Sequence, residues 1–272
     1  MTAPLNGIPQ IGLGTWNRLG PEGVAVVRTA LELGYRHLDT AQSYGSEPTV
    51  AEAIRQSGVP RDEVFITSKV ADTNLDRDRF LPSVRKSLDD LATDRVDLML
   101  IHWPSARDAV PFEHYVEALG EIQDRGWAWK VGISNFPMAL VDRAEAILGP
   151  GRLAANQVEV HPYLQNRRLR AHCAAKGIAV TAYMPLAKGR VADDPILRAI
   201  ANWHGATPAQ VTLAFLMAEG LIVIPSSTDC GRLAGNLAAT DIALTAEEMA
   251  AVRTLERNGR IIDPEKSPRW DD

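Results

Sequence analysis

The sequence predicts an α/β fold, a (β/α)8 TIM barrel with a short N-terminal β-hairpin and a C-terminal helix and tail. Short apolar runs alternate with amphipathic segments of helical spacing, and eight such runs follow one another from Ile11 onward. Eight units in about 250 residues are typical of this barrel. A doubly wound sheet shares the alternation. The count and the absence of a low-complexity linker favour the barrel, so we expect residues 1–272 to form a single domain.

Composition narrows the classes of function. Hydrophobic residues make up 46% and charged residues 23%, as in ordinary globular proteins, and the net charge of -5 does not favour nucleic acid or an anionic membrane. The start of the chain lacks a signal-peptide pattern, and no apolar run is long enough to span a bilayer. Cys173 and Cys230 suit either two free thiols or one bridge, and the composition favours free thiols in a reducing compartment. We therefore expect a cytoplasmic monomer with no nucleic-acid or membrane partner.

The elements follow in order from the residue patterns. Asn6-Gly7 suits a tight hairpin turn, Gly34 suits a helix stop, and Thr245 with Glu248 suits a helix start. Strands are expected at residues 11–15, 35–39, 64–69, 96–102, 129–134, 155–160, 178–183 and 221–225. Helices are expected at residues 24–33, 47–56, 80–91, 111–125, 138–148, 167–176, 195–204, 208–219, 231–238 and 246–257.

Polar side chains stand at the carboxyl end of nearly every predicted strand. In a barrel of this kind, those ends meet on one face and carry the active site. The residues in question are Asp39, Lys69, His102, Ser134, Asn135, Gln157, Tyr183, Ser226 and Ser227. Their regular placement indicates a site, because random surface loops would not supply polar groups at such regular positions.

Each of these residues also has an ordinary structural interpretation. Asp39 suits a turn cap about as well as a site, and a single histidine such as His102 is more often a satisfied core residue. Lys69, however, shares its strand face with Phe65 and Thr67. If that face points into the barrel, the ammonium is buried and needs a partner, for which Asp39 is the obvious candidate.

Together with Tyr44, these residues fit acid catalysis by a phenol. A nearby ammonium is expected to lower the pKa of Tyr44, which is about 10 in the absence of neighbours, while Asp39 keeps Lys69 charged. Tyr44 would then give a proton to a developing alkoxide, and neutral His102 would donate a hydrogen bond to the carbonyl oxygen. None of these groups is a reductant, so a hydride carrier must bind.

The sequence also contains parts of two other kinds of site, a metal centre and a dinucleotide fingerprint. His37, Asp39, His102 and His161 lie at or near strand ends and suit a divalent metal, as in metal hydrolases. The other strand ends offer Lys, Ser, Asn, Gln and Tyr, which are poor ligands, so no metal is expected. Gly12-Leu13-Gly14 is similar to the start of a dinucleotide fingerprint, but Asn17 stands where the third glycine belongs.

Five motifs in this order resemble those of the aldo-keto reductases. The resemblance runs from about Ile8 to the last helix and is closest to the bacterial 2,5-diketo-D-gluconic acid reductase B and methylglyoxal reductase group. The family motifs are Gly34–Gly45, Ile66–Lys69, Leu100–Pro104, Val131–Phe136 and Asn156–Glu159, and those of the closer group are Pro162–Arg167 and Ile224–Thr228.

The resemblance implies NADPH-dependent reduction of small aldehydes, α-dicarbonyls or keto sugars. Tyr44 would be the proton donor, Asp39 and Lys69 would tune it, and His102 would orient the substrate. The implied cofactor-binding residues are Gly14, Thr15, Trp16, Asp39, Ser134, Asn135, Gln157, Tyr183, Met184, Leu186, Ser226, Ser227, Thr228, Arg232 and Asn236. The implied substrate-binding residues are Trp16, Tyr44, His102, Trp103 and Phe136. The same barrel could instead be a nucleotide-binding sensor module with little turnover.

The chain departs from the family pattern around the cofactor. Ser226 replaces the lysine that helps many relatives bind the 2′-phosphate, so Arg232 is expected to be the only cation there. A guanidinium suits a phosphate, so NADPH is expected to be preferred and NADH to bind more weakly. Met184 stands where many relatives have serine, so the loss of one pyrophosphate contact is expected.

Short loops also bear on the substrate. The connection from Pro104 to Pro111 is brief and the tail after Arg257 is modest, so an open, wet mouth is expected. Such a mouth favours small polar carbonyls. Trp270 is expected either to line this mouth or only to dock the tail.

Overall fold

Parallel strands and helices alternate along the chain in the computed structural model, which describes residues 3–271. Met1, Thr2 and Asp272, which the predicted domain includes, lie outside the described residues. The strands are β1 (Leu13–Gly14), β2 (His37–Asp39), β3 (Phe65–Val70), β4 (Val96–Ile101), β5 (Ala128–Ser134), β6 (Leu153–Glu159), β7 (Ala179–Tyr183) and β8 (Leu221–Val223). The α-helices are α1 (Gly20–Leu33), α2 (Glu47–Ser57), α3 (Arg77–Asp90), α4 (Phe112–Asp124), α5 (Met138–Leu148), α6 (Arg167–Ala175), α7 (Pro195–His204), α8 (Pro208–Ala218), α9 (Cys230–Ala238) and α10 (Ala246–Arg253).

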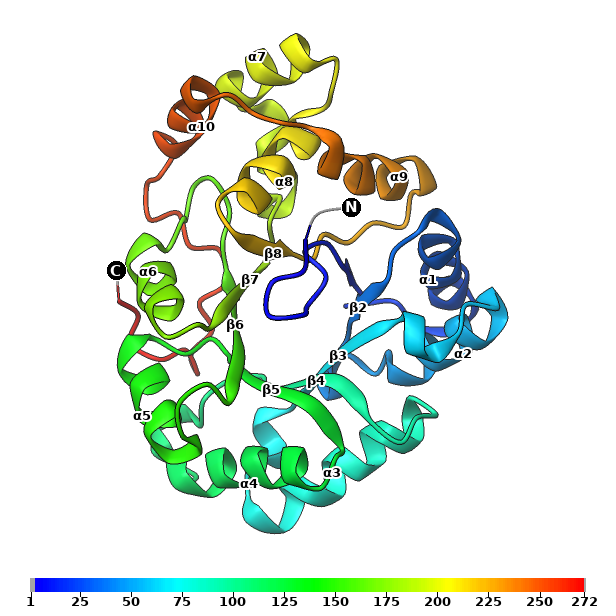
Figure 1. Ribbon diagram of the computed structural model, residues 1–272, viewed down its shortest axis with the longest axis vertical. Coiled ribbons are helices and arrows are strands. Elements are labelled where there is room, and N and C mark those ends of the chain that lie inside the picture. Colours follow the sequence, from blue (N-terminus) through cyan, green and yellow to red (C-terminus); the bar gives the residue numbers. More distant parts are fainter. Residues whose placement is uncertain (1–2, 272) are drawn as a thin grey trace.

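The strands pair side by side in sequence order, and all seven pairs from β1 to β8 are parallel within the described residues. A parallel bridge between Ile11 and Val223 then joins the two ends of the sheet. The amide of Gly12 donates to the Val223 carbonyl at 2.9 Å, and the Val223 amide donates to Gln10 at 2.9 Å. Figure 1 shows the resulting ring of strands with the helices outside it. The predicted barrel is confirmed, and the doubly wound sheet was wrong.

A tight hairpin turn precedes the barrel. Leu5 and Ile8 exchange backbone hydrogen bonds across Asn6 and Gly7, which both have positive φ angles of 51° and 73°. The Asn6 side chain donates to the carbonyls of Ala154 and Gly177, which ties the turn to the segments that open β6 and β7. The turn thus lies at the amino ends of the strands, opposite the end where function is expected.

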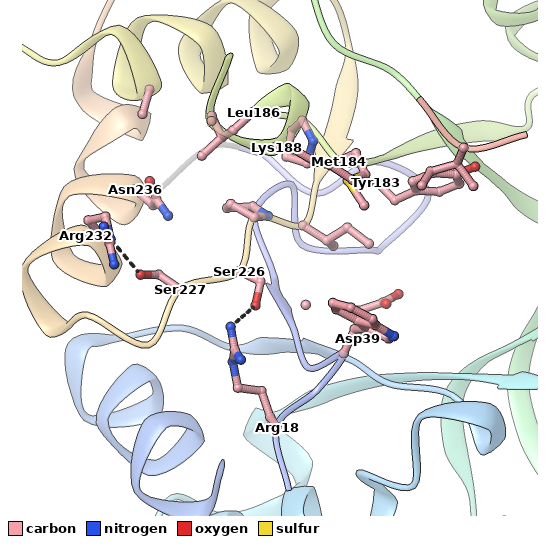
Figure 2. A pocket seen from close by; sticks show the side chains of 18 of the residues that line it. Arg18, Asp39, Tyr183, Met184, Leu186, Lys188, Ser226, Ser227, Arg232 and Asn236 are labelled. Carbon is pink, nitrogen blue, oxygen red and sulfur yellow. Dashed lines mark hydrogen bonds between the residues drawn. The ribbon is translucent and has the colours of Figure 1, made fainter. Parts of the chain in front are cut away.

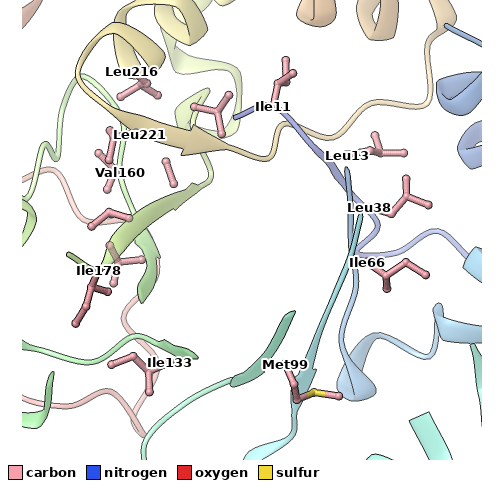
Figure 3. Close-up of a cluster of buried hydrophobic side chains, with 14 of the residues drawn as sticks. Ile11, Leu13, Leu38, Ile66, Met99, Ile133, Val160, Ile178, Leu216 and Leu221 are labelled. Atoms are coloured by element: carbon pink, nitrogen blue, oxygen red, sulfur yellow. The ribbon is translucent and has the colours of Figure 1, made fainter. Parts of the chain in front are cut away.

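The barrel interior holds its own small apolar cluster. Buried side chains that point inward, such as Phe65, Leu98 and Leu100, pack there with Ile8 from the hairpin. Alternate residues of the same strands, such as Met99, pack outward against the helices, because successive strand side chains point to opposite faces. Figure 3 shows this outer layer around the ring. This apolar cluster does not include the side chains at the carboxyl ends of the strands, where the polar residues lie.

Most predicted elements are found within a few residues of their predicted bounds, and the differences have local causes. Helix α1 begins at Gly20, before the first apolar residue at Val24, because Pro21 suits the first turn of a helix. The last helix ends at Arg253, where Arg257 was expected, because the chain leaves to bond the Tyr163 carbonyl. The capping box of Thr245 and Glu248 is present as predicted.

The C-terminal tail runs back across the carboxyl end of the barrel. The carboxylate of Glu159, at the end of β6, accepts from the amides of Ile261 and Ile262 at 2.7 and 2.8 Å. Glu159 is fully buried, and it also pairs with His161 at 2.9 Å. Further along, Lys266 forms an ion pair with Asp72 near the end of β3. These anchors place the tail beside the predicted site.

Candidate active site

A cavity of about 1070 Å³ opens at the carboxyl ends of the strands. Figure 2 shows its labelled side chains, which come from the ends of strands β2 and β7, from loops that follow strands, and from helix α9. Predicted residues that line it are Gly14, Trp16, Asp39, Tyr44, His102, Trp103, Ser134, Asn135, Gln157, Tyr183, Met184, Leu186, Ser226, Ser227, Thr228, Arg232 and Asn236. The structure therefore brings most of the sequence-predicted site into one cavity.

Lys69 and Asp39 form a buried ion pair, as the strand pattern predicted. The Lys69 ammonium lies 2.6 Å from Asp39 Oδ1 and donates to the Thr40 carbonyl at 2.8 Å. The second carboxylate oxygen of Asp39 accepts from Gln157 Nε2 at 2.7 Å. Burial lowers the pKa of Lys69, but Asp39 and Tyr44 together more than offset this effect, so the pKa is raised. Lys69 is therefore a cation that is held in place, and the Asp39 carboxylate neutralises its charge.

Tyr44 lies on the short 3-10 helix η1 (Gln42–Tyr44) that follows β2, and its hydroxyl faces Lys69 at 3.5 Å. The expected direction of its pKa shift was wrong. Burial raises the pKa of Tyr44, and Asp39 raises it further. Lys69 lowers it by a smaller amount, so the net shift is upward. A phenol has a low-energy charged form only in a polar medium, and here it is largely desolvated. Tyr44 is thus a protonated group at neutral pH, which suits an acid that must hold a proton before giving it.

His102 follows β4 and packs edge-on against the Tyr44 ring, with centroids 5.5 Å apart. Burial lowers the pKa of His102 well below its ordinary value of 6.5, and the cations Lys69 and Lys266 lower it further. The imidazole is therefore neutral at pH 7, as the sequence analysis expected. Its Nδ1 lies 3.2 Å from the Ser43 hydroxyl.

The sequence analysis missed Ser43, although it immediately precedes Tyr44 and also lines the cavity. A neutral imidazole has one donor nitrogen and one acceptor nitrogen. If the Ser43 hydroxyl donates to Nδ1, Nε2 carries the proton and can donate to a ligand. Ser43 is thus placed to select the tautomer of His102.

Hydrogen-bonded amides and hydroxyls cross the ends of β5, β6 and β7. Asn135, which has a positive φ of 64°, donates to the His102 carbonyl at 3.0 Å and to Ser134 at 3.1 Å. Ser134 donates to the Gln157 carbonyl at 2.8 Å, and the Tyr183 hydroxyl donates to Asn135 at 2.8 Å. These bonds hold the polar groups rigidly beside the Tyr44 end of the cavity.

Some predicted site residues do not line the cavity. Phe136 is completely buried and packs against Phe112 of α4, with ring centroids 6.0 Å apart, so its prediction as a mouth residue was wrong. The left-handed turn at Asn135 directs the chain away from the cavity at that point. Thr15 is also buried, and its hydroxyl donates to the Asp39 carbonyl. It supports the loop and does not reach the cavity.

Trp270 docks the tail and does not line the cavity. Its ring packs edge-on against Trp103 with centroids 6.2 Å apart, and its indole N–H donates to Asp263 at 2.9 Å. Trp103 does line the cavity, as predicted, together with Ile262 and Pro264 of the tail. Trp16, which is 65% exposed, covers another part of the wall. The tail thus supports one wall of the mouth through Trp103.

The cationic residues around the cavity were only partly predicted. Arg232 donates from Nε to the Ser227 hydroxyl at 3.1 Å, which places it in the cavity as expected. Arg18 and Lys188 line the cavity as well, and the sequence analysis named neither of them. Arg18 donates to the Ser226 hydroxyl at 2.9 Å. Its position two residues after Trp16, in the loop after β1, was the signal that the sequence analysis overlooked.

Comparisons with known proteins agree with this geometry. Residues 10–257 match the Aldo/keto reductase family. The chain belongs to this family. It is 48% identical over 265 residues to the methylglyoxal reductase DkgB of Salmonella typhi, a match that covers 97% of this chain and 99% of that protein. As a member of this family with reductase relatives, the chain is an oxidoreductase, and these likenesses support carbonyl reduction.

Solved structures give the same result. A protein provisionally named 2,5-diketo-D-gluconic acid reductase B superposes with a TM-score of 0.94 at 43% identity, covering 98% of this aldo-keto reductase and 96% of that chain. The Bombyx mori aldo-keto reductase AKR2E4, solved in complex with NADP, superposes with a TM-score of 0.87 at 34% identity, over 97% of this chain and 94% of that one. Aldo-keto reductases use NAD(P)H, so a nicotinamide cofactor is expected in this cavity.

The remaining predictions concern a metal site, membrane spans and the two cysteines. Within residues 3–271, no three histidine, cysteine or acidic side chains are grouped so that they could hold a metal ion. His37 instead contacts Thr67, and His161 contacts Glu159. The described residues contain no helix both long and apolar enough for a membrane span. Cys173 and Cys230 are free thiols, as predicted.

Proposed function

We propose that this aldo-keto reductase uses NADPH to reduce small aldehydes, α-dicarbonyls or keto sugars to alcohols, with Tyr44 as the proton donor. One observation carries the proposal. A protonated Tyr44 lies between a buried Lys69–Asp39 pair and a neutral His102, all at one end of a cavity large enough for a dinucleotide. Such an arrangement can deliver a proton but cannot supply a hydride.

The nicotinamide, when bound, supplies the hydride to the carbonyl carbon. Tyr44 then gives its hydroxyl proton to the carbonyl oxygen, which completes the alcohol. The Lys69 ammonium, 3.5 Å away, stabilises the phenolate left on Tyr44 until solvent returns the proton. His102 donates a hydrogen bond from Nε2 to the same carbonyl oxygen, and Asp39 keeps Lys69 charged and in place.

The residues of the cavity fit a nicotinamide dinucleotide. Ser134, Asn135, Gln157 and Tyr183 line the cavity. The first three would hold the carboxamide, and the Tyr183 ring would stack on the nicotinamide. Gly14 and Trp16 would line the nicotinamide end, with Met184 and Leu186 along the cleft. The residues proposed for the adenosine part are Ser226, Ser227, Thr228, Arg232 and Asn236.

We infer that NADPH is preferred to NADH. The support is the Arg232 guanidinium, which lines the cavity beside Ser227 and suits a 2′-phosphate. The NADP complex of the Bombyx mori relative also supports this choice. NADH, which lacks the phosphate, should bind more weakly.

The wall of the mouth supports a small substrate. Trp16 and Trp103 form apolar surfaces there, while Tyr44 and His102 provide the polar groups that a carbonyl needs. The segment between β4 and α4 holds only the short 3-10 helix η4 (Ala106–Asp108). Methylglyoxal, named for the Salmonella typhi relative, fits this description and is the first substrate to test.

We further propose that residues 1–272 act as one domain and as a monomer in the cytoplasm. Every proposed catalytic side chain comes from the barrel of one chain, so a second copy is not needed to complete the site. The two free thiols are typical of a reducing compartment.

A steady-state assay of NADPH oxidation with methylglyoxal and a panel of other small carbonyls tests the proposed function. We expect turnover with at least one α-dicarbonyl or aldehyde, and no effect of a chelator such as EDTA. NADPH binding without turnover on the whole panel would contradict the proposal and favour a nucleotide-binding sensor. Loss of activity with the chelator would favour a metal enzyme.

A further inference from the structure

The cleft has three parts that follow one another in space, as Figure 2 shows. Asp39 and Tyr183 lie at one end, beside the proposed reaction centre. Arg232 and Asn236 lie at the other end. Between them, Arg18 and Ser226 stand on one side of the cleft, and Lys188 stands across from them on the loop after β7.

Arg18 is a partly buried cation that forms no ion pair with a carboxylate in the described part of the chain. Its guanidinium donates to the Ser226 hydroxyl at 2.9 Å and to the Asn17 carbonyl at 3.2 Å. Its Nε is buried and has no hydrogen-bond partner among residues 3–271. Burial also lowers the pKa of Arg18. A partly buried guanidinium without a carboxylate partner is well suited to bind an anion.

Lys188 is a second uncompensated cation facing the same part of the cleft. Its backbone has a positive φ of 55°, so the loop presents this residue in an unusual conformation. Within residues 3–271, no carboxylate forms an ion pair with either Arg18 or Lys188. Two acids line the cavity, but Asp39 is paired with Lys69, and Asp229 accepts from the Arg232 amide at 2.8 Å.

A dinucleotide has the same order as the cleft. Its nicotinamide lies at one end, its adenosine with any 2′-phosphate at the other, and its pyrophosphate in the middle. The pyrophosphate carries two negative charges, and guanidinium and ammonium groups are the side chains that best match phosphate oxygens. Resting on the proposed function, we propose that Arg18 and Lys188 bind the cofactor pyrophosphate from opposite sides of the cleft.

This assignment separates two phosphate sites along one cleft. Arg232 and Ser227 stand at the adenosine end, where only NADPH carries a phosphate. Arg18 contacts Ser226, the proposed adenosine residue that lies nearest the middle of the cleft, and would meet the pyrophosphate that both cofactors carry. It also accounts for Met184, whose side chain cannot donate a hydrogen bond to the pyrophosphate. The charge of Arg18, supplied from the loop after β1, takes the place of that contact.

The test is a fluorescence titration of NADPH and NADH against the wild-type protein and the variants Arg18→Ala, Lys188→Ala and Arg232→Ala. Arg18→Ala should weaken both cofactors by the same factor, about tenfold or more, because a charge-assisted hydrogen bond to a shared group is lost. Lys188→Ala should also weaken both equally, by a smaller factor because its ammonium is exposed. Arg232→Ala should weaken NADPH selectively.

Arg79→Ala is the matched control, since it removes an exposed arginine of α3 that does not line the cavity. It should leave both dissociation constants unchanged, and thermal melting should show that each variant is folded. Loss of NADPH binding alone in Arg18→Ala would overturn the assignment and place Arg18 at the 2′-phosphate. Unchanged binding of both cofactors would overturn it outright. If the wild-type protein bound neither cofactor, the proposed function itself would fail.

Discussion

The two ends of the cleft handle charge in opposite ways. At the catalytic end, Lys69 and Asp39 are fully buried and satisfy each other at 2.6 Å, with Thr40 and Gln157 completing their hydrogen bonds. Toward the middle and far end, the only side-chain partners of Arg18 and Arg232 among residues 3–271 are the hydroxyls of Ser226 and Ser227. The charges of the catalytic end neutralise each other without a ligand. The cations of the middle and far end have no such neutralising partner.

This difference matches the chemistry of the two ligands. A carbonyl substrate is neutral, so the site that receives it must already have its charges arranged, and the Lys69–Asp39 pair does this. A dinucleotide brings its own negative charges, so the groups that receive it are best left without carboxylates. Changes at the catalytic end should therefore alter turnover, and changes at the other end should alter cofactor affinity.

Replacing Tyr44 with Phe should have the largest effect on turnover. The change removes only the hydroxyl that faces Lys69, so kcat should fall by about 100-fold to 10,000-fold, the usual contribution of a general acid. NADPH affinity should remain within a factor of about two, since no charge at the cofactor end changes. Steady-state kinetics and a fluorescence titration on the same sample measure both quantities. Wild-type turnover in this variant would remove Tyr44 from the mechanism.

Replacing Lys69 with Met should affect both turnover and folding. The change leaves Asp39 as a buried charge without its cation, which costs about 3–5 kcal/mol of unfolding free energy. Adding Asp39→Asn should recover much of that stability but not the turnover, because the phenolate of Tyr44 still lacks its cation. Denaturant unfolding and steady-state kinetics measure the two effects. Lys86→Met, at an exposed lysine of α3, is the control and should change neither.

Replacing Arg232 with Ala should separate the binding of NADPH from the binding of NADH. We expect NADPH binding to weaken by about tenfold to a hundredfold, as for a lost charge-assisted hydrogen bond, and NADH binding to change little. The turnover number at saturating NADPH should stay close to the wild-type value, because the catalytic residues do not contact Arg232. Equal weakening of NADH and NADPH would show that this guanidinium does not read the 2′-phosphate.

The smallest effect is expected for Ser43→Ala. The Ser43 hydroxyl lies 3.2 Å from His102 Nδ1, so its loss frees the imidazole to adopt either tautomer. We expect a severalfold rise in KM for the carbonyl with a smaller change in kcat, and Ser43→Thr should retain the wild-type values because it keeps the hydroxyl. If Ser43→Ala and Ser43→Thr behaved alike, the hydroxyl would have no role in orienting His102.

The sequence allowed prediction of the barrel, its strand order and the Lys69–Asp39 contact, because strand periodicity decides which side chains point inward. It failed where the outcome depends on burial or on a single turn. The pKa of Tyr44 is raised because desolvation exceeds the influence of Lys69, and no residue pattern shows that balance. Phe136 turns into the core after the left-handed Asn135. Arg18 was not predicted as a site residue, because its contact with Ser226 joins two loops far apart in the sequence.

The salt dependence of the wild-type protein tests the contrast between the two regions most directly. Salt screens the attraction between partly exposed cations and the phosphates of a cofactor. It screens the attraction within a fully buried ion pair much less. The dissociation constant for NADPH should therefore rise steeply between low and high salt, while kcat at saturating NADPH stays constant. A dissociation constant that does not respond to salt, or a kcat that falls in parallel with affinity, would contradict this division of the cleft.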